Sequence, residues 1–276
     1  EDFLLAMTTP PMNSNDLKGK PPSMIYSNNA LPLQKPSVRG AFALETKCPL
    51  EGEPSMFEDK YRLFPRDEQL LFEKNLVSMI YLAGKYENVG ASLSQVKAIV
   101  ENLTVDGVKP EDVQTVLNLK AAYQFVMRLH NVAEIDTDTI KQINLIVQGA
   151  GEPDAGQIRT KSVVVGLTNE DYVPPIPIES NVVQTVNAIL HSETSVTDKA
   201  ITLMLTLSRL QVFTDSNKRI VVANALMYQA NVGLLAVPEK KMHWYLSQLA
   251  KYYKTGRIQV IKQWLYDHAV FGINES

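Results

Sequence analysis

A chain of 276 residues with 45% hydrophobic and 21% charged residues has the composition of a folded globular protein, and its length allows one large domain or two modest ones. The formal net charge of −3 at pH 7 removes the usual electrostatic basis for binding nucleic acid, and the single cysteine, Cys48, excludes disulfide frameworks and multi-thiolate zinc sites. No apolar run approaches the roughly 20 residues that cross a bilayer, and the chain opens without a basic signal-peptide start. We therefore expect a soluble cytoplasmic protein without membrane or nucleic-acid partners.

The first 60 residues differ in composition from the rest of the chain. More than half of the 15 prolines fall before residue 66, together with the turn-forming stretches 13–15 and 27–29. This composition predicts an extended, proline-rich arm over residues 1–60 rather than regular secondary structure. Two apolar patches, at residues 24–26 and 41–44, favour an arm that lies against the folded body over a free tail.

From Pro65 onward, apolar residues recur with helical spacing. Pro65 followed by Asp67 and Glu68 is typical of a helix start, because proline is favoured at the first position and acids suit the first turn. Three more stretches share the helical period: residues 92–103, 110–130 and 137–147. Asp136 is expected to cap the last of them.

The helical pattern breaks between residues 149 and 177. Glycine-rich loop material is followed by the β-branched run 163–165, a turn at 169–171 and Tyr172, a pattern typical of a β-hairpin. Helical spacing then resumes over five stretches: residues 178–192, 195–212, 218–232, 239–254 and 257–269. The chain therefore predicts a mainly α fold with one β-hairpin, which disfavours the Rossmann and TIM-barrel classes.

The densest polar cluster lies in the short connection between two strongly apolar helical stretches. A loop that feeds a helix N-terminus exposes backbone N–H groups and the positive end of the helix dipole. Lys218 and Arg219 at this point would complete an anion site suited to phosphate, and Asp215 could hold a divalent cation that bridges phosphate oxygens. The same residues also fit a plain helix connector with its own polar cap and two surface cations.

This loop resembles the signature of the Fic (Fido) domain family, His-Pro-Phe-x-Asp-Gly-Asn-Gly-Arg. Four residues fall on its defining positions: Phe213, Asp215, Asn217 and Arg219. The apolar helical stretches on both sides and the last two helical stretches are also similar to the family. The resemblance implies a Fic-type helical bundle over residues 61–276 that binds ATP with Mg²⁺ and transfers AMP to hydroxyl groups of target proteins.

The predicted hairpin resembles the flap of that family in order and spacing. The flap, at about residues 155–175, aligns a target protein over the bound nucleotide in family members. The residues that the resemblance places on it here are Arg159, Val164, Val165 and Gly166. The alternative is an ordinary surface hairpin.

A segment at about residues 66–90 resembles the family's inhibitory helix. Glu87 stands at the position of the inhibitory glutamate, with Ala83 where the family has serine or threonine. That glutamate usually pairs with a second arginine of the signature, and Val222 occupies that arginine's position here. Two interpretations of Glu87 therefore remain: an inhibitory contact, or a solvated charge at a helix end.

The signature departs from the family at the position that carries the chemistry. Gln211 stands where the family has the histidine that acts as general base, and an amide cannot accept a proton near neutral pH. Ser216 and Lys218 replace the two glycines of the loop. The lysine resembles the Doc toxin branch, whose members transfer the γ-phosphate of ATP but keep the histidine.

These features predict a Fic-type protein that binds nucleotide or phosphate at the 211–219 loop, with AMP transfer weak or lost. Asp215 would coordinate Mg²⁺. The phosphate contacts would come from Ser216, Asn217, Lys218 and Arg219. Two alternatives remain: an active AMP- or phosphoryl-transferase with shifted chemistry, and a non-enzymatic module in which the flap and the arm bind a partner protein.

Overall fold

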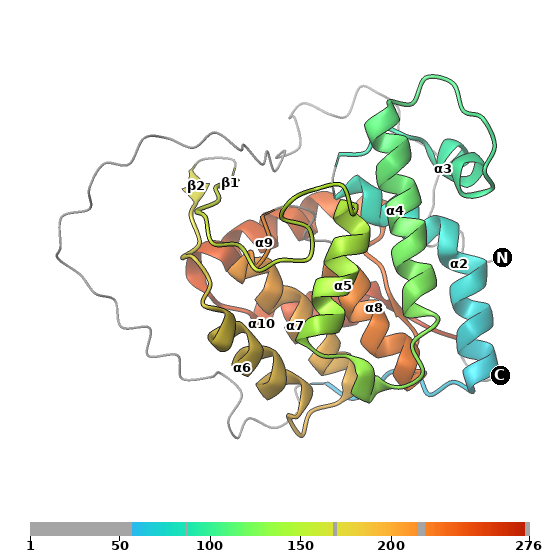
Figure 1. Cartoon of the computed structure of the whole chain (residues 1–276). Coiled ribbons are helices and arrows are strands. Elements are labelled where there is room, and N and C mark those ends of the chain that lie inside the picture. The colour runs from blue at the N-terminus through green and yellow to red at the C-terminus, as the bar shows by residue number, and fades with distance from the viewer. Residues whose placement is uncertain (1–56, 87, 168–169, 215–218, 274–276) are drawn as a thin grey trace.

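The computed structural model describes residues 57–86, 88–167, 170–214 and 219–273, and these parts form a helical bundle (Figure 1). Two antiparallel neighbours, α7 (Val196–Leu210) and α8 (Arg219–Ala230), pack against each other along their lengths at its centre. The first nine residues of α8 are all buried, as expected of a helix that is apolar on every side. The expected mainly α fold is confirmed, whereas most of the expected arm, residues 1–56, lies outside the described residues.

The helices before the hairpin begin where local signals predict. They are α2 (Pro65–Lys85), α3 (Leu93–Val100), α4 (Pro110–Val126) and α5 (Thr137–Gln148). Proline occupies the first turn of α2 and α4, and Ser92 forms a capping box with Gln95 at the start of α3. The Asp136 carboxylate accepts the Thr139 N–H at 2.8 Å and confirms the expected cap of α5.

Three more helices follow the hairpin, and two of them, α6 and α10, pack on α7. They are α6 (Glu179–Leu190), α9 (Met242–Thr255) and α10 (Gln259–Ala269). Two short 3₁₀ turns, η1 (Val132–Glu134) and η2 (Glu239–Lys241), precede α5 and α9. Each of these α-helices begins slightly later than the sequence pattern indicates. Ile178 is an extended N-cap before α6, the 3₁₀ turn η2 precedes α9, and Ile258 is the N-cap of α10.

The described part of the chain contains two small antiparallel sheets. The predicted hairpin is confirmed as β1 (Val165–Gly166) and β2 (Asp171–Tyr172), and it projects from one end of the bundle in Figure 1. A second pair, β3 (Leu234–Leu235) with β4 (Val270–Phe271), was not predicted. Sequence reasoning missed it because each strand has two residues, too few to show alternation, and the partners lie far apart in the chain.

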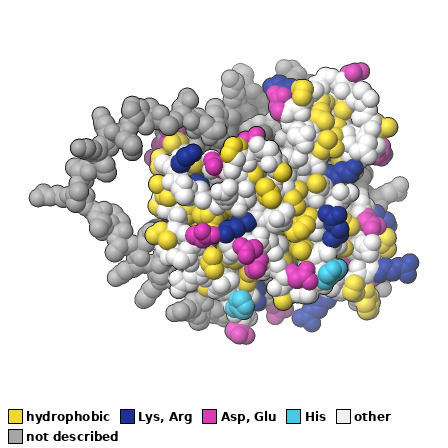
Figure 2. Space-filling model, in the orientation of Figure 1, with side chains coloured by type: hydrophobic (Ala, Val, Ile, Leu, Met, Phe, Trp, Pro, Cys, Tyr) yellow, Lys and Arg dark blue, Asp and Glu magenta, His cyan; other side chains and the backbone are white. Residues whose placement is uncertain are grey.

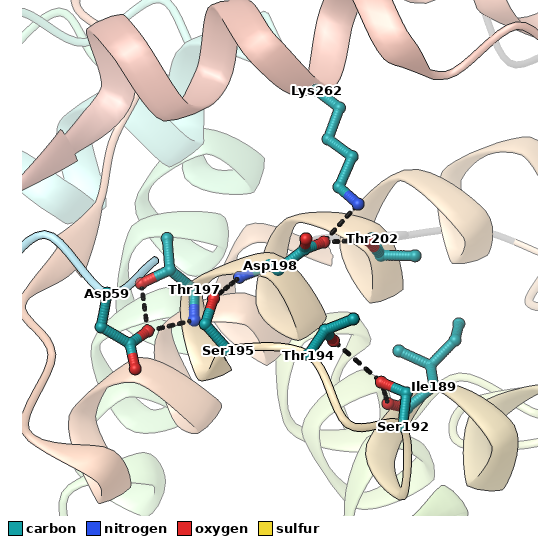
Figure 3. A network of polar contacts seen from close by, with 9 residues as sticks. All are labelled: Asp59, Ile189, Ser192, Thr194, Ser195, Thr197, Asp198, Thr202 and Lys262. Carbon is teal, nitrogen blue, oxygen red and sulfur yellow. Dashed lines mark hydrogen bonds and ion pairs between the residues drawn. The ribbon is translucent and has the colours of Figure 1, made fainter. Parts of the chain in front are cut away.

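The segment before α2 is fixed to the start of α7. One carboxylate oxygen of Asp59 accepts hydrogen bonds from the backbone N–H and the hydroxyl of Thr197, each at 2.8 Å (Figure 3). Phe57 stacks on Tyr266 of α10 with ring centroids 4.3 Å apart. An acidic side chain on the N–H groups of a helix N-terminus is favoured by the helix dipole, so this contact defines where the N-terminal segment joins the bundle.

A buried ion pair lies beside this contact. Lys262 of α10 pairs with Asp198 of α7, which also accepts a hydrogen bond from the Thr202 hydroxyl at 3.2 Å (Figure 3). Both charged side chains are less than a tenth exposed. Such a pair ties α10 to the first turn of α7.

One face of the molecule shows charged side chains of both signs (Figure 2). The face drawn in Figure 2 carries basic, acidic and apolar side chains interspersed, without a continuous field of one sign. Among the described helices, none is both long enough and apolar enough to cross a membrane.

Candidate functional site

The candidate site lies where α7 ends and α8 begins. Gln211 stops α7 with a left-handed backbone (φ 46°, ψ 57°), a conformation more usual for glycine. Val212 and Phe213 follow with buried side chains, which fixes the start of the loop in the core. The predicted ligands Asp215, Ser216, Asn217 and Lys218 lie outside the described residues, so their roles stay predictions.

The Gln211 side chain is part of the packed interior. It is 1% exposed, and its Nε2 donates to the Ser208 carbonyl at 2.8 Å and toward the Tyr253 hydroxyl at 3.4 Å. The amide is thus engaged with the last turn of α7 and with α9. All four histidines of the chain are exposed and lie outside the flap and the loop: His130, His191, His243 and His268.

Arg219 opens α8 with a buried guanidinium. It is only 8% exposed, and within the described part of the chain its Nε and Nη2 atoms have no hydrogen-bond partner. The interpretation of Arg219 as a plain surface cation is therefore wrong. Two buried guanidinium nitrogens without partners are costly, and an anion bound at this helix N-terminus would satisfy them. Val222, one turn further on, is a buried core residue.

The flap residues differ in exposure. Val165 is fully buried, whereas Val164 and Gly166 are half-buried on the hairpin. Arg159, which the family resemblance places on the flap, is 2% exposed and lies at the hairpin's base. Its Nε donates to the Gln211 carbonyl and its Nη2 to the Pro175 carbonyl, and burial lowers the pKa of its guanidinium.

Two tyrosines connect the flap to the helices below it. The Tyr172 hydroxyl of β2 donates to the Arg209 carbonyl at 3.0 Å, and its ring stacks on Tyr253 with centroids 5.3 Å apart. Burial raises the pKa of Tyr172. The sequence gives no sign of this cluster, because Tyr172, Arg209 and Tyr253 come from three separate segments of the chain and no local pattern links them.

The proposed inhibitory segment is a helix, as the sequence predicts. α2 ends at Lys85 with Tyr86 as its C-cap, and Ala83 is buried against the bundle. α2 packs on α8, the helix that starts at Arg219. Glu87 itself lies outside the described residues, so its inhibitory role stays a prediction.

A small polar cleft of about 50 Å³ adjoins the loop on the flap side. Its lining comes from Asp154, Gln157, Ile158, Arg159, Thr160, Lys161 and Thr214. Thr214 is the last described residue before the predicted ligands, so the cleft reaches the end of the described part of the loop. Charged groups of both signs and two hydroxyls make it suited to a polar group rather than an apolar one.

Comparison with known proteins gives matches to solved structures only; neither a family model nor a curated protein matches the chain. Fic-1 from C. elegans superposes with a TM-score of 0.62 at 19% identity, covering 76% of this chain and 64% of that one. A Fic domain containing signaling protein from Bacteroides thetaiotaomicron gives 0.63 at 14% identity over 74% and 85%. A Fic family protein from Desulfovibrio desulfuricans gives 0.57 at 15% identity over 76% and 75%.

These superpositions define the class of the protein: it has the Fic fold. The identities of 14 to 19% carry the likeness of fold alone. The chain spans 64% of the length of the Fic-1 structure that it matches. Its activity, ligands and partners are therefore argued from its own residues.

Proposed function

We propose that this Fic-fold protein binds nucleotide or another phosphate compound at the 211–219 loop and has weak or no AMP-transfer activity. The observation that supports the proposal most directly is the buried Arg219 guanidinium, whose Nε and Nη2 lack partners within the described residues. A guanidinium presents a planar set of donors that matches two phosphate oxygens. Its place in the first turn of α8 adds the positive end of the helix dipole.

We propose that ATP binds at this loop together with Mg²⁺, as the family resemblance implies. Within the described residues, no group of three or more His, Cys, Asp or Glu side chains could hold a metal ion. Magnesium is commonly held by one or two carboxylates together with phosphate oxygens, and Asp215 would supply the carboxylate. When bound, the ion would neutralise phosphate charge beside Arg219 and Lys218.

The same geometry argues against efficient transfer to a hydroxyl. A general base must lie within hydrogen-bond reach of the proton that it removes. Gln211 offers no titratable group, and its amide is buried against Ser208 and Tyr253. Loss of a positioned base typically costs about 10²- to 10⁴-fold in rate.

A second candidate function is binding of a polypeptide at the flap. Val173, Ile176 and Ile178 are each more than half exposed, and all three lie on the extended segment that leaves β2. Large apolar side chains gathered on an exposed segment are typical of a contact surface. This candidate predicts normal partner binding after Asp215→Ala and after Arg219→Met.

Isothermal titration with ATP and Mg²⁺ tests the principal proposal. The natural chain should bind, and Arg219→Met should lose at least about ten-fold in affinity, because a charge-assisted contact contributes about 1.5–3 kcal/mol. Arg257→Met is the matched control, since Arg257 is exposed and lies outside the loop. Absence of heat at millimolar nucleotide in the natural chain would remove the proposal.

Labelled ATP distinguishes AMP transfer, phosphoryl transfer and the absence of both. The natural chain is incubated with a cell lysate and ATP labelled at either the α- or the γ-phosphate. Protein-bound α-label would indicate AMP transfer and γ-label phosphoryl transfer, whereas the proposal expects little of either.

A further inference from the structure

The C-terminus of α7 is capped almost entirely by the hairpin segment. The last carbonyls of a helix have no partner within the helix and must find donors elsewhere. Here the Arg209 carbonyl accepts from the Tyr172 hydroxyl, and the Leu210 carbonyl accepts from Arg159 Nη2 at 3.3 Å. The Gln211 carbonyl accepts from Arg159 Nε, and the Val212 carbonyl accepts from the Arg159 N–H at 3.0 Å. Every carbonyl from 209 to 212 is thus paired with the flap segment.

The Arg159 side chain also joins the two stems of the hairpin. Its Nη1 donates to the Lys161 carbonyl at 2.8 Å, on the stem that leads into β1. Its Nη2 donates to the Pro175 carbonyl at 2.7 Å, on the stem that leaves β2. One buried guanidinium therefore connects both stems to the end of α7.

Helix α9 also contacts the flap segment and the end of α7, through Tyr253. The Tyr253 carbonyl accepts from Arg209 Nε at 3.2 Å, and its ring stacks on Tyr172. Its hydroxyl also accepts the weaker contact from Gln211. A non-glycine residue keeps a left-handed backbone only where surrounding contacts hold it in place. At Gln211 the contacts from Arg159 and Tyr253 do so.

We infer that Arg159 is a positioning residue that makes the flap and the C-terminus of α7 one body and thereby fixes the start of the anion-binding loop. The hairpin then does not open as a separate lid, because opening would leave four successive carbonyls without donors. Only the effect on ligand binding rests on the proposed function. The mechanical coupling is a property of the unliganded chain.

Hydrogen exchange measured by mass spectrometry on the full chain tests the coupling without any ligand. Arg159→Ala should raise amide exchange at least ten-fold in residues 159–172 and in residues 207–213 together, and should leave α2 and α10 unchanged. Methylguanidinium added to Arg159→Ala should restore protection in both segments, whereas methylammonium should not. A residue with a merely general packing role would show neither the paired loss nor this selective rescue.

A matched control removes a similar cap elsewhere. Gln229 of α8 donates to the carbonyls of Val126 and Leu129 at the end of α4, at 3.1 and 2.9 Å. Gln229→Ala should raise exchange near residues 126–134 and leave the flap protected. Should Arg159→Ala fail to fold, Tyr172→Phe removes a single hydroxyl, and it should still raise exchange in β2 and in the last turn of α7. Loss of protection in the flap alone, or in neither segment, would overturn the inference.

ATP titration then separates this inference from the proposed function. Arg219→Met should lose affinity with unchanged exchange in the flap. Arg159→Ala should lose at least ten-fold in affinity and recover it with methylguanidinium. If the natural chain binds no ATP, the proposed function fails, while the exchange experiment still decides whether Arg159 couples the flap to the loop. If ATP binds equally well to Arg159→Ala, the positioning role in binding is wrong.

Discussion

Glu68 gives the protein a predicted loss of stability as the pH rises. This residue lies in the first turn of α2 and is fully buried. One carboxylate oxygen accepts the Gly233 N–H at 2.9 Å, and the other has no hydrogen-bond partner within the described residues. Burial raises the pKa of this carboxyl from 4.5 to about 7, with the Gly233 hydrogen bond opposing the shift.

The sign of the effect follows from which state holds the proton. Between about pH 4.5 and pH 7 the folded chain keeps a proton on Glu68 that the unfolded chain has lost, so the free energy of unfolding falls as the pH rises through this range. At 1.36 kcal/mol for each unit of pKa, the full effect is about 3 kcal/mol, of which about 2 to 3 kcal/mol falls between pH 5 and pH 8. Neighbouring Tyr228, whose own pKa is raised by burial and by Glu68, stays protonated throughout.

Urea unfolding at pH 5, 6, 7 and 8 measures this contribution. Glu68→Gln keeps an acceptor for the Gly233 N–H but cannot ionise, so its stability relative to the natural chain should rise by about 2 to 3 kcal/mol between pH 5 and pH 8. Glu111→Gln is the matched control, because Glu111 occupies the first turn of α4 and is exposed. A difference between natural chain and Glu68→Gln that does not change with pH would refute the reasoning.

Three further substitutions test other parts of the account. Gln211→His supplies an imidazole with a pKa of about 6.5, which is largely neutral at pH 7.5 and can accept a proton. This variant should give measurable AMP transfer or auto-modification with α-labelled ATP. Equal transfer by the natural chain would show that the missing base is not limiting. Lys262→Met leaves Asp198 buried without its cation and should lower the free energy of unfolding by about 3–5 kcal/mol in urea, and a loss below about 1 kcal/mol would contradict the buried pair. Gly233→Ala should destabilise by about 2 kcal/mol or more in thermal unfolding, because φ is +89° and the added Cβ would lie 2.2 Å from the Phe271 carbonyl oxygen; unchanged melting would contradict the tight turn.

Local signals made much of the fold predictable. Pro65 at a helix start and Asp136 as an N-cap depend on neighbouring residues alone, and both are confirmed. The β3–β4 pair could not be foreseen, since Leu234 and Phe271 meet only after the intervening helices have packed.

The position of the site in the sequence could be predicted, but the contacts of its side chains could not. The signature pattern locates Gln211 and Arg219 in the sequence, but it does not predict their contacts. The Gln211 side chain contacts α9, and the buried Arg219 side chain has two nitrogens without partners among the described residues. The role of Arg159 depends on carbonyls more than 50 positions away in the chain, which no local period encodes.

A crystal structure of the natural chain soaked with ATP and Mg²⁺ tests the central claim most directly. We predict phosphate oxygens within about 2.7–3.2 Å of Arg219 Nε and Nη2, at the N-terminus of α8, with the Gln211 side chain still directed toward Ser208. Nucleotide bound elsewhere, or a loop without nucleotide at millimolar concentration while Arg219 keeps its unpaired nitrogens, would contradict it.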